Sequence, residues 1–247
     1  MILLKLGGSV ITDKSSPVTP RREAVRSIAE VLSRLDEPMI LIHGGGSYGH
    51  YWSVVHDIHT RPDRYDPCGV AIVKNSMVKL NGIILDSLTE GGLAPYNLPP
   101  SALFCSDEIV AKSAAEARDV AESGMTPVTY GDVLWSGNKT TYILSGDAIM
   151  GRLAHILKPR LCIFATDVDG LYRDMKDDRP IDVVDDHNFR ISEVRMDVTG
   201  GMRRKVDEAT RIAGDGCDVL FLNGNRPERI TSAIRDCTFH GTLFMGR

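Results

Sequence analysis

Cysteine is scarce in this chain and follows no pattern. The five cysteines, at positions 68, 105, 162, 217 and 237, lie far apart in the sequence and form no CxxC pair. An odd, scattered set argues against a disulfide framework and is typical of reduced thiols in a cytosolic protein. No combination of His, Cys and Asp has the spacing of metal ligands either. We therefore predict a cytoplasmic location and no metal site built by the protein alone.

An excess of positive charge is also missing. The chain has 29 Lys and Arg against 33 Asp and Glu, a formal net charge of -4, whereas nucleic-acid-binding proteins usually carry a strong basic patch. No uninterrupted apolar run approaches the ~20 residues that a transmembrane helix needs. The apolar start "MILLKL" turns to glycine at once, unlike a signal peptide. We predict no nucleic-acid partner and no membrane contact.

The two common nucleotide-binding signatures are absent. No GxxxxGK[ST] phosphate loop occurs in the sequence. The stretch "GGGSYG" at 44–49 satisfies a loose GxGxxG pattern, but no acidic residue ends a following strand about 20 residues later. A dinucleotide-dependent oxidoreductase is therefore the weakest interpretation.

What is present is a regular alternation of strands and helices in a chain of 247 residues that is 43% hydrophobic. The apolar patterns predict strands at 1–6, 38–43, 125–130, 160–166 and 217–224, and a hairpin at 132–144. They predict helices at 21–35, 69–92, 111–124, 146–158, 201–216 and 226–236. Such alternation indicates an α/β fold with an open, mostly parallel sheet and helices on both faces.

Two helix starts can be placed from local signals. Thr19 followed by Pro20 predicts the start of the helix at 21–35, with the proline in the first helical position. A further helix is expected to begin just after Gly49.

Glycine-bearing stretches follow four of the predicted strands. They are "KLGGS" (5–9), "HGGGSYGH" (43–50), "LSGDAIMG" (144–151) and "TDVDGLY" (166–172), and a fifth, "DVTGGMRRK" (197–205), opens a helix. Ligands of open parallel sheets bind beyond the carboxyl ends of the strands. Glycine lets backbone amides approach an anion, and a helix N-terminus adds a favourable dipole. These stretches together predict a polyphosphate ligand.

Three lysines support this prediction. Lys5 lies inside the first apolar strand, where a lysine is costly unless it meets an anion; the alternative is a lysine that points to solvent from an edge strand. Lys14 follows in the next loop, and Lys205 lies near the start of the helix after "GG". Phosphoryl transfer depends mainly on positioning and charge neutralisation, so converging cations favour that chemistry.

In their order and spacing, "KLGGSVIT", "HGGGS", "TDVDGLY" and "DVTGGMRRK" resemble the amino acid kinase family. The resemblance spans nearly the whole chain and implies a three-layer αβα sandwich. It also implies one domain over 1–247, with an acceptor-binding lobe at about 1–150 and an ATP-binding lobe at about 151–247. Within the family, "HGGGSYGH", "LSGDA" and "DVTGGM" look most like the branch that phosphorylates isopentenyl phosphate, and His50 is its best discriminator. Fosfomycin kinases share that histidine.

The resemblance implies a set of ATP-contacting residues. Those at the phosphates and in the nucleotide pocket would be Lys5, Gly7, Gly8, Ser9, Gly46, Asp167, Gly170, Tyr172, Gly201 and Lys205. Lys14 would stabilise the phosphoryl group in transfer, and Asp147 would orient the lysines of the site. The catalytic set is then Lys5, Lys14, His50, Asp147 and Lys205.

The acceptor side follows from the same resemblance. Gly45, Gly146 and His50 would face the substrate phosphate. Val73 and Tyr130 are candidates for shaping an apolar tail pocket, with core packing as the alternative for each. Gly131 is a candidate to present its backbone amide to the substrate. His43, at the end of a buried strand, is interpreted as a hydrogen-bonded structural residue.

The predicted function is ATP-dependent phosphorylation of isopentenyl phosphate, or a close prenyl monophosphate, to the diphosphate, with Mg²⁺ carried by the nucleotide phosphates. The alternatives are a fosfomycin-type or small-carboxylate kinase on the same fold, and a non-catalytic nucleotide-sensing module. The resemblance also implies a homodimer. The sequence leaves the tail length of the acceptor open.

Overall fold

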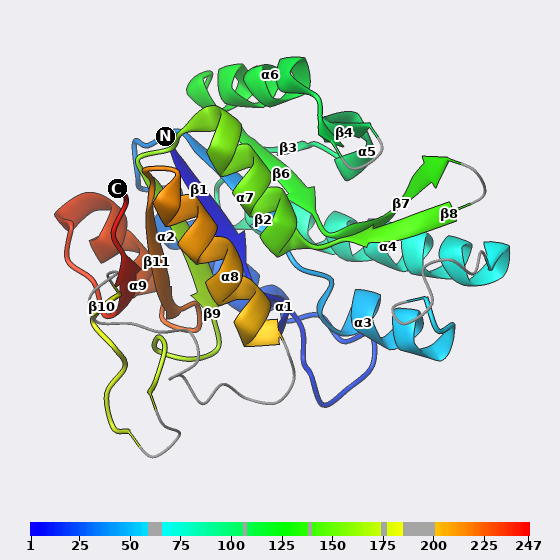
Figure 1. Ribbon diagram of the computed structural model, residues 1–247, viewed down its shortest axis with the longest axis horizontal. Helices are drawn as coiled ribbons and strands as arrows, with labels where there is room; N and C mark the ends of the chain where they lie inside the picture. The colour runs from blue at the N-terminus through cyan, green and yellow to red at the C-terminus, as the bar shows by residue number, and fades with distance from the viewer. Residues whose placement is uncertain (59–65, 106–107, 138–139, 174–176, 185–200) are drawn as a thin grey trace.

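The computed structural model describes residues 1–58, 66–105, 108–137, 140–173, 177–184 and 201–247. Within them an eight-stranded sheet forms the middle layer (Figure 1), and its strand order is β10-β12-β11-β9-β1-β2-β6-β3. Its strands are β1 (Ile2–Leu6), β2 (Met39–His43), β3 (Pro95–Asn97), β6 (Thr126–Tyr130), β9 (Leu161–Thr166), β10 (Val183–Val184), β11 (Asp218–Asn223) and β12 (Gly241–Phe244). All neighbours run parallel except β11 and β12.

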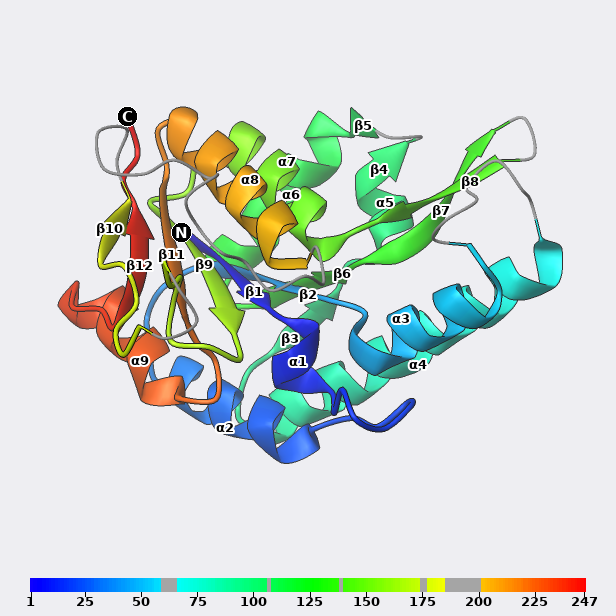
Figure 2. The same cartoon turned by 60° about the horizontal axis from the view of Figure 1, so that its bottom comes forward.

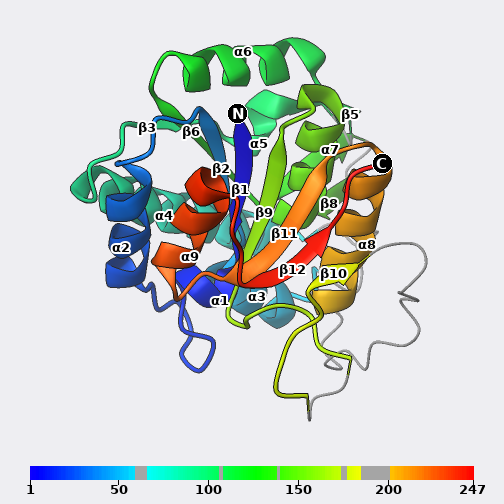
Figure 3. The same ribbon diagram turned by 90° about the vertical axis from the view of Figure 1, so that its left-hand side faces the viewer.

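Helices cover both faces of this sheet. One face carries α2 (Arg22–Leu32), α4 (Pro67–Glu90) and α9 (Pro227–Thr231), and the other carries α6 (Ala111–Glu122), α7 (Gly146–Leu157) and α8 (Gly201–Gly214) (Figure 2). Alternate residues of β1 enter separate cores, because successive side chains of a strand point to opposite faces: Ile2 and Leu4 pack on the α2 side, and Leu3 on the α7 side. Figure 3 shows α2 and α9 on one side of the sheet and α8 on the other. The predicted three-layer αβα sandwich is confirmed.

Smaller elements complete the described chain. They are α1 (Gly8–Ile11), α3 (Gly46–Val55), α5 (Pro100–Leu103), a π-helical turn (Ser232–Asp236) after α9, and two antiparallel pairs, β4 (Phe104–Cys105) with β5 (Glu108–Ile109) and β7 (Asp132–Gly137) with β8 (Thr140–Leu144). The predicted hairpin is confirmed by β7 and β8, while residues 138–139 of its turn lie outside the described residues.

Both predicted helix starts are wrong by a few residues. Helix α3 begins at Gly46 and not after Gly49, so His50 lies inside the helix. Helix α2 begins at Arg22 after an Arg21 cap, because Pro20 is engaged elsewhere, in an antiparallel bridge with Thr12. This long-range pairing gives no local signal in the sequence.

Helix α4 is the longest apolar helix of the described residues. By length and mean hydropathy alone it could cross a membrane, although Lys74 and Lys79 interrupt its apolar residues. Its Leu80 and Ile84 are buried in the core on the α2 side of the sheet, and a core helix of a soluble protein passes the same test.

All five cysteines are free.

Candidate active site

Two glycine-rich loops meet at the carboxyl edge of the sheet. Gly7 and Gly8 follow β1, and Gly44, Gly45 and Gly46 follow β2, which runs parallel to β1. A Cβ atom on Gly8 would lie 2.6 Å from the Cα of Gly46, and Gly46 has a φ of 47°. A side chain would clash at the first position and strain the backbone at the second. The glycines therefore bring two backbones together, in addition to any contact with a ligand.

Thr12 fixes the two loops to each other. Its Oγ1 donates a hydrogen bond to the carbonyl oxygen of Gly8 at 2.7 Å and accepts one from the amide of Ser47 at 2.9 Å. Because Thr12 is 1% exposed, this link is shielded from water. The two loops predicted to hold phosphates are thus joined through one buried side chain.

A carboxylate with two lysine partners lies next to these loops. Asp147, in the first turn of α7, has its Oδ1 3.0 Å from the Nζ of Lys5 and its Oδ2 3.4 Å from the Nζ of Lys205. The three residues come from β1, α7 and α8, so only the fold brings them together. Lys5 is 3% exposed on a central strand, which rules out the alternative of an edge-strand lysine that points to solvent. We refer to Lys5, Asp147 and Lys205 as the ion trio.

The electrostatics of the ion trio favour an anionic ligand. Burial raises the pKa of Asp147, but the charges of Lys5 and Lys205 outweigh burial and hold that pKa below its ordinary value. Burial lowers the pKa of Lys205, and the charge of Lys5 lowers it further, while Asp147 opposes both. Two ammonium groups and one carboxylate leave a formal charge of +1 in a largely buried place. An ATP phosphate is an anion that would offset it.

Lys14 contacts a second aspartate. Its Nζ donates a hydrogen bond to Oδ2 of Asp167 at 2.9 Å, with 68% of the lysine side chain exposed. Partial burial raises the pKa of Asp167, but hydrogen bonds from Lys14 and Ser9 bring it below its ordinary value. The pair therefore links the loop after α1 to the segment after β9. Exposure leaves Lys14 free to move toward a phosphoryl group.

The two histidines of "HGGGSYGH" lie in different environments. His50 is exposed on α3, and its carbonyl oxygen accepts a hydrogen bond from Ser53 at 3.0 Å. His43 is 1% exposed, and burial lowers its pKa. Its Nδ1 lies 3.0 Å from the Gly44 carbonyl oxygen, and its Nε2 lies 3.2 Å from Asn81 Oδ1. These contacts fit the interpretation of His43 as a structural residue and leave the His50 imidazole accessible to a substrate.

The candidates for the acceptor pocket lie among packed residues. Tyr130 is 4% exposed, and its ring stacks on that of His43. Burial raises the pKa of Tyr130 to about 12, with a further contribution from the charge of Asp132. Val73 is buried in a small cluster with Ile58 and Val133, apart from the two main cores. Packing is therefore established for both, and a role in shaping a tail pocket stays a prediction.

The backbone at Gly131 is hydrogen-bonded and closely packed, and its contact with the substrate stays a prediction. The amide of Gly131, predicted to face the substrate, donates to the carbonyl oxygen of His43 at 3.0 Å and is already used. A Cβ atom on Gly131 would lie 3.0 Å from the amide nitrogen of Gly146, so its glycine is needed for backbone packing. A Cβ on Gly146 would in turn lie 3.1 Å from Cε of Lys5, which puts Gly146 beside the ion trio. Gly45 packs against Gly49 and Met77 of α4.

The predicted nucleotide-pocket residues lie beyond β9 and at the start of α8. Gly170 packs closely on Thr242, since a Cβ there would lie 2.7 Å from its Oγ1. Tyr172 is half-buried, and burial raises its pKa, with a further contribution from Asp169. Gly201 opens α8, and its carbonyl oxygen accepts a hydrogen bond from Lys205 Nζ at 3.2 Å. Residues 197–200 of the fifth glycine stretch lie outside the described residues.

Comparison with known proteins places the chain in a family. The family model described as the amino acid kinase family matches residues 1–223. The chain belongs to the amino acid kinase family. It is 36% identical to isopentenyl phosphate kinase of Thermoplasma acidophilum, over 98% of this chain and 99% of that one. It is 32% identical to isopentenyl phosphate kinase of Methanothermobacter thermautotrophicus, over the full length of both.

Solved structures agree with this placement. The crystal structure of the T. acidophilum isopentenyl phosphate kinase product complex superposes with a TM-score of 0.81 at 33% identity, and 99% of each chain is covered. A substrate complex of isopentenyl phosphate kinase superposes equally well, with the same identity and coverage. The sequence-based assignment to the amino acid kinase family, and to its isopentenyl phosphate kinase branch, is therefore confirmed.

Two polar contacts between distant segments were not predicted from the sequence. Lys74 of α4 forms an ion pair with Oδ2 of Asp132, a buried carboxylate at the start of β7 whose pKa is raised by burial against the effect of Lys74. Arg21 donates from Nη1 to the Ser9 carbonyl oxygen at 3.1 Å and to Asn225 Oδ1 at 2.7 Å. In the sequence, Asp132 is marked only by its position directly after "YG". The residues that form these contacts lie far apart in the chain, so no local pattern predicts them.

Proposed function

We propose that this chain transfers the γ-phosphoryl group of ATP to isopentenyl phosphate, or to a close prenyl monophosphate, and forms the diphosphate. The observation that carries the acceptor class is the full-length similarity to relatives named isopentenyl phosphate kinase, together with an exposed His50 beside the glycine loop after β2. The ion trio supports the transfer of an anionic group. We assign the residues up to about 150 mainly to the acceptor and the remainder mainly to ATP.

The proposed step needs no general base. A phosphomonoester has a second pKa near ~6, so at neutral pH its oxygen is already an ionised nucleophile. That oxygen forms a bond to the γ-phosphorus of ATP, the bond to the β–γ bridging oxygen breaks, and ADP leaves with the electron pair. The enzyme then has two tasks, to hold two anions in line and to offset their repulsion.

The chain offers separate groups for these tasks. Lys5 and Lys205, oriented by Asp147, would bind the ATP phosphates at the edge formed by Gly7, Gly8 and Ser9. Lys14 would leave Asp167 and follow the phosphoryl group as it moves. His50 would donate a hydrogen bond to the acceptor phosphate from α3, where its ring is exposed.

Mg²⁺ is proposed to be bound chiefly by the ATP phosphates, whose charge it would partly neutralise. Among the described residues, no group of three or more His, Cys, Asp or Glu side chains is placed to hold a metal ion. Asp167, an exposed carboxylate that pairs with Lys14, could accept a hydrogen bond from a water of such an ion. We further propose a homodimer in the cytoplasm, on the basis of the family resemblance and the scattered free cysteines.

A panel assay tests the acceptor. With ATP and Mg²⁺, we expect isopentenyl phosphate to give the highest kcat/KM among isopentenyl phosphate, dimethylallyl phosphate, fosfomycin, acetylglutamate, carbamate and UMP. A higher value with fosfomycin or a carboxylate would reject the prenyl assignment and favour the same-fold alternative. ATP binding without transfer to any acceptor would favour a nucleotide sensor.

His50→Ala is expected to impair use of the acceptor much more than binding of ATP. A hydrogen bond to a charged group is worth roughly 1.5–3 kcal/mol, so kcat/KM for the acceptor should fall by about one to two orders of magnitude. His50→Gln, which keeps a donor, should recover part of this loss. Kinetics with both substrates varied would measure the effect.

His43→Ala is the matched control for the other histidine of the stretch. Because His43 is buried between Gly44, Asn81 and Tyr130, its loss should lower the melting temperature without a selective effect on the acceptor. Wild-type acceptor efficiency in His50→Ala would remove the main local support for a phosphate acceptor.

A further inference from the structure

The two helices that carry Asp147 and Lys205 touch one turn below the ion trio. Gly151 follows Asp147 by four residues on α7, and Glu208 follows Lys205 by three on α8, so each lies on the same face of its helix as the trio member. A Cβ atom on Gly151 would lie 1.6 Å from Oε1 of Glu208 and 2.6 Å from its Cδ. The carboxyl group of Glu208 therefore occupies the space that a side chain at 151 would take. We call this contact the glycine notch.

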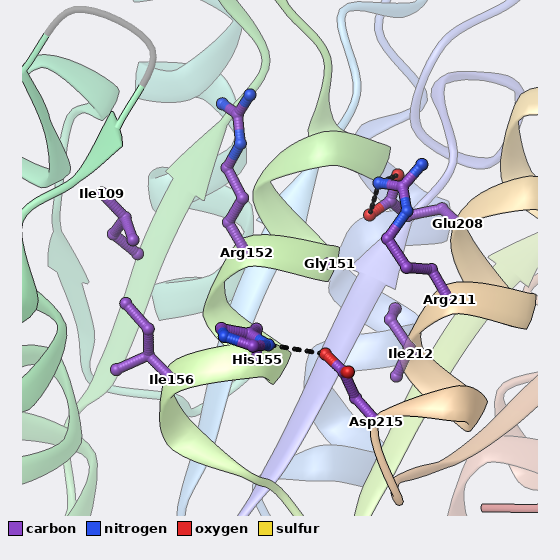
Figure 4. A pocket seen from close by; sticks show the side chains of 9 residues that line it. All are labelled: Ile109, Gly151, Arg152, His155, Ile156, Glu208, Arg211, Ile212 and Asp215. Atoms are coloured by element: carbon purple, nitrogen blue, oxygen red, sulfur yellow. Dashed lines mark hydrogen bonds and ion pairs between the residues drawn. The ribbon is translucent and has the colours of Figure 1, made fainter.

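Glu208 is an unusual residue for such a contact. It is 8% exposed, and burial raises its pKa, against the charges of Arg211 and Arg152 and together with that of Asp147. Both of its oxygens accept hydrogen bonds from Nη1 of Arg211, at 3.1 and 3.0 Å, as Figure 4 shows. A buried carboxylate costs folding free energy, and an apolar side chain would fill the same volume at lower cost. The bonds to Arg211 do, however, hold the carboxyl group in one orientation.

The glycine notch and the contact between Lys205 and Asp147 lie between the same two helices. The contact between Lys205 and Asp147 is already 3.4 Å long, and Lys205 also donates to the Gly201 carbonyl oxygen of its own helix. The lysine thus moves with the first turn of α8. If α8 moved away from α7 at the glycine notch, the ammonium group would be displaced from Asp147 by a similar amount. A misplacement of about 1 Å can cost ~10²-fold in rate.

We propose that Glu208, seated in the glycine notch, is a positioning residue for phosphoryl transfer: it sets the spacing of α7 and α8 and thereby holds Lys205 against Asp147. This role rests on the proposed kinase function and adds a residue that does not touch the substrate. It is a role of shape and packing, with Arg211 fixing the rotamer of the carboxyl group.

The first test fills the glycine notch. Gly151→Ala should lower kcat by about 10- to 100-fold and change the KM values for ATP and the acceptor much less, because the added methyl group displaces the Glu208 carboxyl group that sets the spacing of the two helices. Gly214→Ala is the matched control on α8: nothing lies within 4 Å of a Cβ there, so kcat should stay at the wild-type value. A wild-type kcat in Gly151→Ala would overturn the proposal.

The second test asks whether shape is restored. In Gly151→Ala/Glu208→Ala the new methyl group enters the space vacated by the carboxyl group, so kcat should recover by about tenfold over Gly151→Ala. Glu208→Gln keeps the shape without the charge and should retain kcat within about threefold of the wild type. A double variant with a kcat no better than that of Gly151→Ala, or a Glu208→Gln variant with a kcat tenfold or more below that of the wild type, would contradict a packing role.

The third test separates positioning from general stability. In a Lys205→Ala background, assayed at high enzyme concentration, Gly151→Ala should still lower the melting temperature but reduce kcat by less than about threefold. An undiminished kcat effect in that background would mean that the glycine notch does not act through Lys205.

All three tests use the best acceptor of the panel, so a wrong prenyl assignment would show in the panel alone and leave these outcomes interpretable.

Discussion

Asp147→Asn is expected to lower kcat by about two orders of magnitude or more and to destabilise the fold. The carboxylate is the shared partner of Lys5 and Lys205, whose side chains are only 4% and 20% exposed. Removal of one partner of a buried ion pair typically costs ~3–5 kcal/mol, because the remaining charge stays buried without compensation. Steady-state kinetics and denaturant unfolding would measure the two losses separately.

The loss of folding stability in Asp147→Asn should depend on pH. The pKa of Asp147 in the folded chain lies below the ordinary value of 3.8, so at acid pH the unfolded chain binds more protons. The stabilisation by Asp147 is then complete above that ordinary value and is lost as pH falls through the folded pKa. The stability gap between wild type and Asp147→Asn should therefore be wide at neutral pH and narrow on acidification.

Asp119→Asn is the control for both measurements, since Asp119 is an exposed carboxylate on α6. It should change neither kcat nor the acid dependence of stability. A normal kcat in Asp147→Asn would mean that the lysines need no shared carboxylate. A stability gap that stays constant down to low pH would mean that charge pairing is not its cause.

The main strands and helices could be predicted because their apolar patterns are local. The runs at 1–6, 38–43 and 160–166 correspond to β1, β2 and β9, which are adjacent in the centre of the sheet. Short elements such as β3 and β12 escaped prediction, because three or four residues carry too little pattern. The start of α2 was wrong because Pro20 pairs with Thr12, a contact that no helix-start signal describes.

The candidate site was predictable where chemistry and chain position coincide. A lysine inside an apolar strand and glycines after strands pointed to an anion site at one edge, and the structure places Lys5, Asp147 and Lys205 together there. Contacts between distant segments were not predictable. The meeting of Gly8 with Gly46, and of Gly151 with Glu208, depends on how two elements pack, which glycine content alone does not encode.

Lys14→Ala is expected to reduce kcat by about 10²-fold while KM for ATP changes much less. The physical reason is that Lys14 is exposed and paired with Asp167 before transfer, so its charge is expected to act mainly on the phosphoryl group in flight. The folded chain should lose little stability, because an exposed ion pair is worth only ~0–1 kcal/mol. Melting curves and kinetics with ATP and acceptor varied would show the separation.

Two further variants make this prediction specific. Lys112→Ala removes an 86% exposed lysine of α6 and should leave kcat unchanged, which controls for the loss of one surface charge. Asp167→Asn removes the partner of Lys14 but keeps the lysine, so kcat should fall less than in Lys14→Ala. If Lys14→Ala instead raises KM for ATP at a near-normal kcat, Lys14 binds the ground-state phosphates. The neutralisation of charge during transfer would then have to come from Lys5 and Lys205.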